Sequence, residues 1–225
     1  MLAQSPSAHR RPLSQAELNM VIDAHERYVS GRPGGKRAAL RFFDFSELDF
    51  SGRNLCDADL SASVFENARM EGARLDRASL FGSDLTKADL RCASLVRADL
   101  RGACLVGLDL TGAELQGANL DGADLRNVSL NGADLRGAKL TAANLTKSDL
   151  RAAHLSGLPL GPQRVNPTNL TSARLRYAQA QGADFTGALL DMADLGGGDF
   201  TGAALAGVSL RGAEIVGAVG LVQRR

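Results

Sequence analysis

The sequence has no tryptophan and few other aromatic residues, with two tyrosines and eight phenylalanines among 225 residues. Its apolar content, 44% of all residues, consists mostly of leucine and alanine. Conventional two-layer domains use large aromatic side chains to fill the space between their layers. The scarcity of such side chains favours a narrow, regular interior that leucine and alanine can fill.

Cysteine is also scarce, and neither a disulfide framework nor a zinc site is indicated. Cys56, Cys92 and Cys104 form an odd set without CxxC spacing. No apolar run reaches the ~18 residues of a membrane span, and the first residues lack the apolar core of a signal peptide. We therefore expect reduced thiols, a cytoplasmic location, no membrane association, no metal and no cofactor.

A strong excess of charge is absent too, because the formal net charge is +1. Residues 1–37 hold six Lys/Arg and three Asp/Glu, and residues 38–225 hold twenty and twenty-two. A balanced chain lacks the basic surface that neutralises phosphates. Direct binding to nucleic acid is not expected.

The sequence is rich instead in a repeat of five residues. From 40 to 215, thirty-six positions have numbers that are multiples of five, and they hold twenty-seven leucines and five phenylalanines. Alanine usually stands two positions earlier and Asp or Asn one earlier, as in Ala118, Asn119 and Leu120. The phase never slips, and a period of five matches neither a helix nor a strand.

Glycine stands two positions after the leucine at eighteen of the thirty-six places, and it supplies a turn. An inward alanine, an outward Asp and an inward leucine follow the alternation of a β-strand. Because five is an odd number, a strand that continued without a turn would point the next leucine outward. A turn after each leucine keeps all leucines inside, and glycine suits such a turn. The pattern predicts stacked coils with five residues per side, and it leaves three or four sides open.

The segments "ANLDG", "ADLRN", "ADLRG" and "ANLTK" resemble the A(D/N)LXX motif of the pentapeptide repeat family, and the resemblance covers 38–217. It implies an all-β fold, a right-handed four-sided (quadrilateral) parallel β-helix solenoid of about nine twenty-residue coils. The repeat contains no recognisable catalytic motif, and a packed leucine interior leaves no cavity for a substrate, so a non-enzymatic protein is expected. Some family members protect DNA gyrase by mimicking DNA, and some dimerise through their C-terminal ends.

The segments outside the repeat are predicted to be a disordered tail (1–12), a capping helix (13–31), a linker (32–37) and a C-terminal tail (218–225). Ser14 and Glu17 form a capping box. One stripe of the helix holds the residues expected to pack on the first coil: Leu18, Val21, Ile22, His25, Tyr28 and Val29. The helix is expected to cover the open N-terminal end of the solenoid.

The repeat weakens at 156–170, where Pro159, Pro162 and Pro167 replace residues that would donate to the ladder. Either a distorted coil or an outward loop explains this break. A loop on a rigid scaffold is a candidate partner site, so Pro162 and Arg164 are candidate contacts. An enzyme site is a remote alternative and would also need a pocket at this break.

Two further surfaces are candidates for protein contact. On a four-sided coil, one mixed-charge strip would hold Arg74, Arg77, Arg97, Arg136, Arg174, Arg176 and Tyr177. Such a strip is either a solvated face or a docking face. The apolar C-terminal end, with Ile215, Val219 and Leu221, either folds over the last coil or pairs with a second copy in a homodimer.

The function expected from these features is a protein-interaction scaffold with an unknown partner. The alternative is a DNA-mimic modulator of DNA gyrase, of the quinolone-protection type. Mimicry of a duplex calls for a markedly acidic rod. A body that carries about −2 makes this the minor hypothesis.

Overall fold

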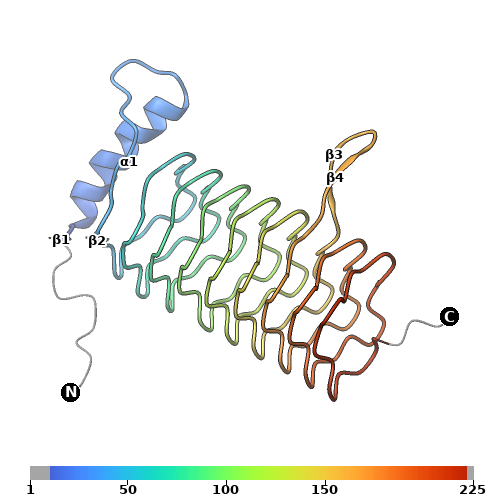
Figure 1. Ribbon diagram of the computed structural model, residues 1–225. Coiled ribbons are helices and arrows are strands. Elements are labelled where there is room, and N and C mark those ends of the chain that lie inside the picture. The colour runs from blue at the N-terminus through green and yellow to red at the C-terminus, as the bar shows by residue number, and fades with distance from the viewer. Residues whose placement is uncertain (1–10, 222–225) are drawn as a thin grey trace, which may run out of the picture.

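The computed structural model describes residues 11–221, which form a rod of stacked coils with a helix at the N-terminal end (Figure 1). The elements are β1 (Arg11–Pro12), α1 (Gln15–Val29), β2 (Phe43–Asp44), β3 (Leu158–Gly161) and β4 (Arg164–Asn166). Residues 1–10 of the predicted tail and residues 222–225 lie outside the described part. Within residues 11–221, no helix has the length and apolar character needed to cross a membrane.

The ladder of the rod repeats every twenty residues. Asp124 bridges Asn144 in parallel, and the same offset recurs along most of the rod. Three backbone hydrogen bonds join these two coils on this side: Leu125 N donates to Asn144 O at 2.8 Å, Asn127 N donates to Thr146 O at 3.1 Å, and Asn144 N donates to Ala123 O at 2.9 Å. Since each side has five residues, one coil has four sides, which the residue pattern alone left open.

Each side ends in a tight turn. Ala118 N donates to Leu115 O at 3.0 Å, and Gly117 between them has a φ of 65°. This left-handed conformation explains why glycine recurs two residues after each leucine. Sixteen other corners hold a non-glycine residue, such as Arg97 at a φ of 57°, at a cost of roughly 1–2 kcal/mol each. The next coil stabilises such corners, since Arg97 N donates to Gln116 O at 2.9 Å.

The interior consists of leucine and alanine columns that exclude water. Leu115, Leu120 and Leu125 are at most 1% exposed, and Ala118 is fully buried. Each buried leucine stabilises the fold by roughly 1.5–3 kcal/mol relative to an exposed one. The polar residues between alanine and leucine face outward, as the alternation predicts.

Helix α1 lies across the N-terminal end of the rod (Figure 1). The predicted capping box is present, because Ser14 Oγ accepts from Glu17 N and Glu17 accepts from Ser14 N. Leu18 and Ile22 are fully buried in the same apolar cluster as the coil interior. The expectation that Tyr28 also packs inward is wrong: its side chain is 47% exposed.

His25 is the polar member of the buried face of α1. It is fully buried, and its Nδ1 accepts a hydrogen bond from Ala38 N at 3.0 Å. Nδ1 must therefore be unprotonated to accept this hydrogen bond, which ties α1 to the start of the first coil. Protonation would break this hydrogen bond.

The pKa of His25 predicts a pH-dependent stability. Burial lowers the pKa, with a contribution from Arg37, and the Cys56 carbonyl, Asp57 and Glu26 oppose this shift only in part. In the unfolded chain this histidine takes up a proton at about pH 6.5, whereas in the native protein it stays neutral to a lower pH. The contribution of His25 to the free energy of unfolding is therefore complete above about pH 6.5 and is lost as the pH falls below that value. Between about pH 7.5 and 5.5, the melting temperature is expected to fall for the native protein.

The matched variant is His25→Gln, whose amide oxygen can still accept from Ala38 N but does not titrate. Its melting temperature is expected to change less than that of the native protein across the same pH range. Equal slopes for the two proteins would remove His25 as the cause.

The break at 156–170 is a protruding β-hairpin (Figure 1). Strands β3 and β4 pair antiparallel, and the ladder skips them: Lys139 bridges Asn169, thirty residues later. The ten residues 158–167 therefore lie outside the coil. Leu160 and Val165, which the five-residue phase assigns to the interior, are 49% and 61% exposed.

The hairpin changes the register of everything that follows it. Ten residues are two sides of a coil, so the phase of five survives while each later residue moves by half a turn. Phe185 consequently stacks on the side of Leu155 and not on that of Phe45 and Phe65, because His154 bridges Asp184. Subtracting ten residues from the 180 of 38–217 leaves 170, or 8.5 coils, slightly fewer than the nine expected.

The coil continues past the predicted boundary at 217. Asp199 bridges Val219, so the last side reaches into the segment predicted as a C-terminal tail. The remainder of that tail, 222–225, falls on residues outside the described part.

Candidate protein-interaction face

We define the hairpin face as the side of the rod centred on Leu75, Leu95, Leu115, Leu135 and Leu155, from which the hairpin emerges. Four of the predicted contact residues lie on it: Arg74, Arg77, Arg97 and Arg136. The hairpin adds Pro162 and Arg164, both exposed. The structure therefore brings the break and part of the predicted strip together.

The other three residues of the predicted strip lie elsewhere. Asn144 bridges Arg174, which places Arg174, Arg176 and Tyr177 on the side of Leu145. That side is two corners away from the hairpin face, and we call it the opposite face. The expectation of one continuous strip is wrong because the hairpin shifts the register by half a turn.

The root of the hairpin is held by hydrogen bonds to Gly137. Asn166 Nδ2 donates to Gly137 O at 2.7 Å, and Gly137 N donates to the buried Thr168 Oγ1 at 2.9 Å. Thr168 Oγ1 in turn donates to Ser156 O at 2.8 Å. A Cβ on Gly137 would lie 2.6 Å from Leu158 Cβ, so only glycine allows this close approach. The hairpin is therefore fixed where it leaves the rod.

A groove of about 410 Å³ lies between the hairpin and the corners of the hairpin face. Its hairpin wall is apolar and consists of Leu158, Pro159 and Leu160, whereas its corner wall is mixed. The corner residues that line it are Asp76, Arg77, Ser94, Val96, Arg97, Glu114 and Gln116. Sequence reasoning missed Val96, Gln116 and Leu158, because only the bend of the hairpin brings them together.

The cations of this face differ in how they are paired. Arg77 contacts Asp57 through two hydrogen bonds of 2.8 and 2.6 Å, which hold the pKa of Asp57 below its usual range. Arg136 pairs in the same way with Asp134. Among residues 11–221, no carboxylate lies within ion-pair distance of Arg97 or Arg164. These two guanidinium groups are available to an acidic partner.

The groove lacks the arrangement of a hydrolytic site. Ser94 Oγ donates to Asp76, and Asp76 also accepts from Val96 N at 3.3 Å, so this carboxylate is engaged by its neighbours. His154 lies three ladder steps from Ser94, or roughly 14 Å at the strand spacing. A histidine base must come within hydrogen-bond reach of the nucleophile, and these two residues do not.

The C-terminal end is a second exposed surface. Ile215 and Val219 are 51% and 52% exposed, and Leu221 is half-buried. Val216, which the sequence analysis did not single out as a contact, is 86% exposed. Among the described residues, no group accepts from the last-coil amides of Leu210 and Ile215. Within residues 11–221, this end therefore combines an apolar surface with ladder amides that have no acceptor.

Comparison with known proteins agrees with this geometry. The family model for pentapeptide repeats matches eight copies, over residues 44–80, 78–117, 118–157 and 168–191. The chain belongs to the pentapeptide repeat family. The match stops at 157 and resumes at 168, so it omits the same ten residues that leave the ladder as the hairpin. No curated protein matches the chain.

Several solved structures of pentapeptide repeat proteins are similar to this chain. HetL, involved in heterocyst differentiation regulation in the cyanobacterium Nostoc, is 30% identical over 91% of this chain and 95% of its own, with a TM-score of 0.34. A thylakoid lumen protein from Arabidopsis thaliana is 30% identical over 52% and 68%, with a TM-score of 0.32. QnrB1, a plasmid-mediated fluoroquinolone resistance protein, is 20% identical over 80% and 86%, with a TM-score of 0.39.

Proposed function

We propose that this pentapeptide repeat protein is a non-enzymatic scaffold that binds a protein partner through its hairpin face. One observation carries the proposal: a hairpin fixed at its root presents exposed Leu160 and Val165 beside a groove lined by Arg97. Arg164 is exposed on the same hairpin, and within residues 11–221 neither arginine has an ion-pair partner. Exposed apolar groups next to available guanidinium groups are typical of protein interfaces. The partner expected is a protein whose surface combines apolar and acidic side chains.

Excision of residues 158–167 tests this proposal without damaging the rod. The deletion joins Gly157 to Thr168, which already occupies the buried position that precedes the next ladder residue. We expect an unchanged circular dichroism spectrum and a free energy of unfolding within about 1 kcal/mol of the native value, since the hairpin is a surface element. A collapse of the fold would mean that the hairpin is part of the coil.

Binding is then compared between matched charge reversals. Arg97→Glu changes the hairpin face, and Lys147→Glu makes the same change on the opposite face, at a corner with nearly the same φ (57° and 59°). We expect affinity capture with quantitative mass spectrometry to identify a partner that the native protein and Lys147→Glu retain. Arg97→Glu and the excised variant should both lose that partner. Equal retention by all four proteins would contradict the proposed surface.

We further propose that the C-terminal end forms a homodimer about a two-fold axis. Support comes from the exposed Ile215, Val216 and Val219 beside an open ladder edge, because such an edge is a template for pairing. Helix α1 lies across the N-terminal end (Figure 1), and we interpret it as a cap over most of the corresponding edge. A monomeric mass at micromolar concentration in light scattering would rule out the dimer.

A gyrase-modulating role remains the minor proposal. The described surface does not supply the dense negative charge of a duplex, because carboxylates such as Asp124, Asp134 and Asp149 each pair with a neighbouring arginine. We expect the purified protein to leave gyrase supercoiling and its ciprofloxacin inhibition unchanged. Protection at micromolar concentration would reverse this ranking.

A further inference from the structure

The outer edge of the first coil has four sides. Each side has one residue whose backbone N–H and C=O do not bond to the second coil. On the first side, Leu40 N donates to Asp59 O and Asp59 N donates to Ala38 O. These bonds use the groups that face the second coil. The N–H and C=O of Ala39 therefore point away from the rod, and those of Asp44, Asp49 and Asn54 do so on the other three sides.

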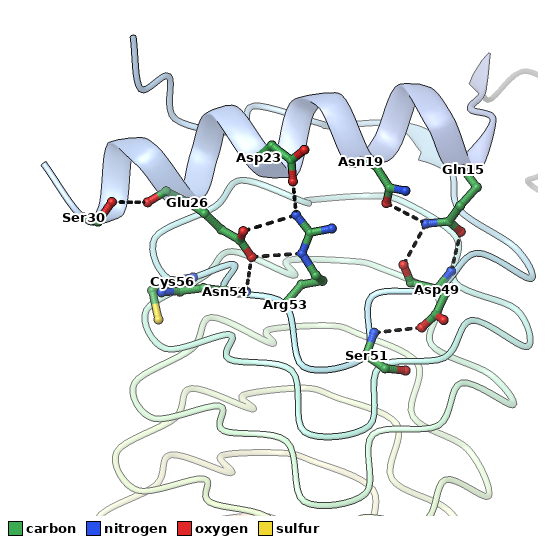
Figure 2. Close-up of polar contacts among 10 residues, drawn as sticks. All are labelled: Gln15, Asn19, Asp23, Glu26, Ser30, Asp49, Ser51, Arg53, Asn54 and Cys56. Atoms are coloured by element: carbon green, nitrogen blue, oxygen red, sulfur yellow. Dashed lines mark hydrogen bonds and ion pairs between the residues drawn. The ribbon is translucent and has the colours of Figure 1, made fainter. Parts of the chain in front are cut away.

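Elements at the N-terminus contact three of these four sides. Strand β1 pairs in parallel with β2 and so covers Asp44. The Gln15 amide covers Asp49 at both groups, accepting from Asp49 N at 2.8 Å and donating to Asp49 O at 2.9 Å (Figure 2). Glu26 accepts from Asn54 N at 3.0 Å.

The fourth side remains open and borders a groove. Ala39 is exposed, and within residues 11–221 no group bonds to its N–H or C=O. The groove beside it, about 530 Å³, runs between the first coil and α1. Its apolar lining consists of Leu13, Met20, Val21, Ala24, Leu40 and Phe43.

The rim of this groove is positively charged. Arg11, Lys36 and Arg37 lie on it, and none of them has a carboxylate partner within the described residues. The Arg11 guanidinium sits 5.8 Å from the centre of the Phe43 ring. The one carboxylate present, Glu17, already accepts hydrogen bonds from Ser14. The groove therefore combines an apolar floor, surplus positive charge and an open strand edge.

We propose that this groove binds an extended acidic peptide segment of a partner protein, which pairs with Ala39 as an added strand. An open strand edge with an adjacent pocket is the arrangement that binds extended peptides elsewhere. A lipid anion could contact the apolar floor and the cations, but it could not hydrogen-bond to both the N–H and the C=O of Ala39 as a strand does. A second copy of this chain is disfavoured because the two positive rims would face each other. The site is separate from the hairpin face.

The test uses the full chain and a synthetic peptide, acetyl-Asp-Val-Asp-Leu-Asp-Val-amide. We expect saturable binding in an NMR titration at low salt, with an affinity in the micromolar range or weaker that suits a small interface. Amide exchange at Ala39 should slow by about tenfold or more at saturation, because its N–H becomes hydrogen-bonded. Two control peptides replace either every aspartate with lysine or the leucine with proline, and both should bind at least about tenfold more weakly.

Protein variants separate the charge from the fold. Lys36→Glu is expected to weaken binding of the acidic peptide about fivefold or more, whereas Lys147→Glu, a surface lysine on the opposite face, should leave it unchanged. Because the peptide controls need no mutation, a folding defect in a variant does not decide the outcome. Equal binding of the acidic and lysine peptides, absence of binding, or binding without protection of Ala39 would each overturn the proposal. A hairpin-excised variant should bind the peptide normally.

Discussion

Replacement of Leu125 by aspartate is expected to lower the free energy of unfolding by about 5 kcal/mol or more. Leu125 is 1% exposed in the middle of the rod, where leucines stack on leucines. The change removes the apolar burial, leaves a cavity and places a carboxylate where no described donor could pair with it. Urea unfolding followed by circular dichroism measures the loss, and a destabilised middle coil should also separate the two halves of the transition.

The matched control for Leu125→Asp is its neighbour Asp124→Asn. Asp124 faces outward and pairs with Arg126 across exposed surface, and such a pair contributes about 1 kcal/mol or less. Asparagine already stands at the equivalent ladder positions Asn119 and Asn144. We expect a change of about 1 kcal/mol or less for this variant. Comparable losses in the two variants would mean that the inward and outward positions are misassigned.

Replacement of Phe65 by alanine is expected to cost about 3–5 kcal/mol. Its side chain is fully buried, and its ring lies 5.0 Å from the Phe45 ring and 5.9 Å from the Phe50 ring. The three rings pack on one another inside the first coils, so alanine at Phe65 leaves a cavity within this aromatic cluster. Thermal and urea unfolding of the variant measure the loss.

Phe81→Ala makes the same chemical change at a corner. Phe81 is 48% exposed, and its main contact is the Arg101 guanidinium 5.3 Å from the ring centre. An exposed cation–π contact contributes about 0.5–1 kcal/mol, so this loss should stay near 1 kcal/mol. If Phe81→Ala costs as much as Phe65→Ala, the corner assignment is wrong.

The local fold follows from the sequence because its causes are local. Leucine, alanine and glycine each occupy a fixed place in five residues, and that place determines whether the backbone extends or turns. The capping box of Ser14 and Glu17 is equally local, and the structure contains it. Even the corners without glycine keep the same conformation, as at Arg97, because their neighbours in the next coil require it.

The order of the faces could not be predicted because it depends on how many residues leave the ladder. An insertion of ten residues leaves a period of five unchanged. Leu160 and Val165 therefore keep the large apolar side chain of the repeat, although they are exposed outside the coil. The same insertion shifts a period of twenty by half a turn, so Tyr177 lies on the opposite face and not on the hairpin face. The three prolines signal the break, but they do not say how many residues it takes out of the coil.

The two grooves could not be predicted for a related reason. Each forms where a segment outside the ladder bends back over it: Leu158 over the corners, and α1 over Ala39. Such contacts depend on the direction in which a segment leaves the rod. The charges that line them are visible in the sequence, but their proximity is not.

Disulfide trapping tests the register across the hairpin most directly. In a background with Cys56, Cys92 and Cys104 replaced by serine, Asn144→Cys and Arg174→Cys place two thiols on bridging residues. The strand spacing of about 4.8 Å lies within the Cα range of a disulfide. We expect this pair to oxidise readily, as judged by non-reducing mass spectrometry.

The control joins Asn144→Cys with Arg164→Cys, which lie twenty residues apart, as in an uninterrupted ladder. Arg164 lies in β4 of the hairpin, outside the coil, so we expect no intramolecular disulfide. Rapid oxidation of the thirty-residue pair alone is the result that the half-turn shift predicts. Oxidation of the twenty-residue pair in its place would contradict the assignment of 158–167 to a hairpin outside the ladder.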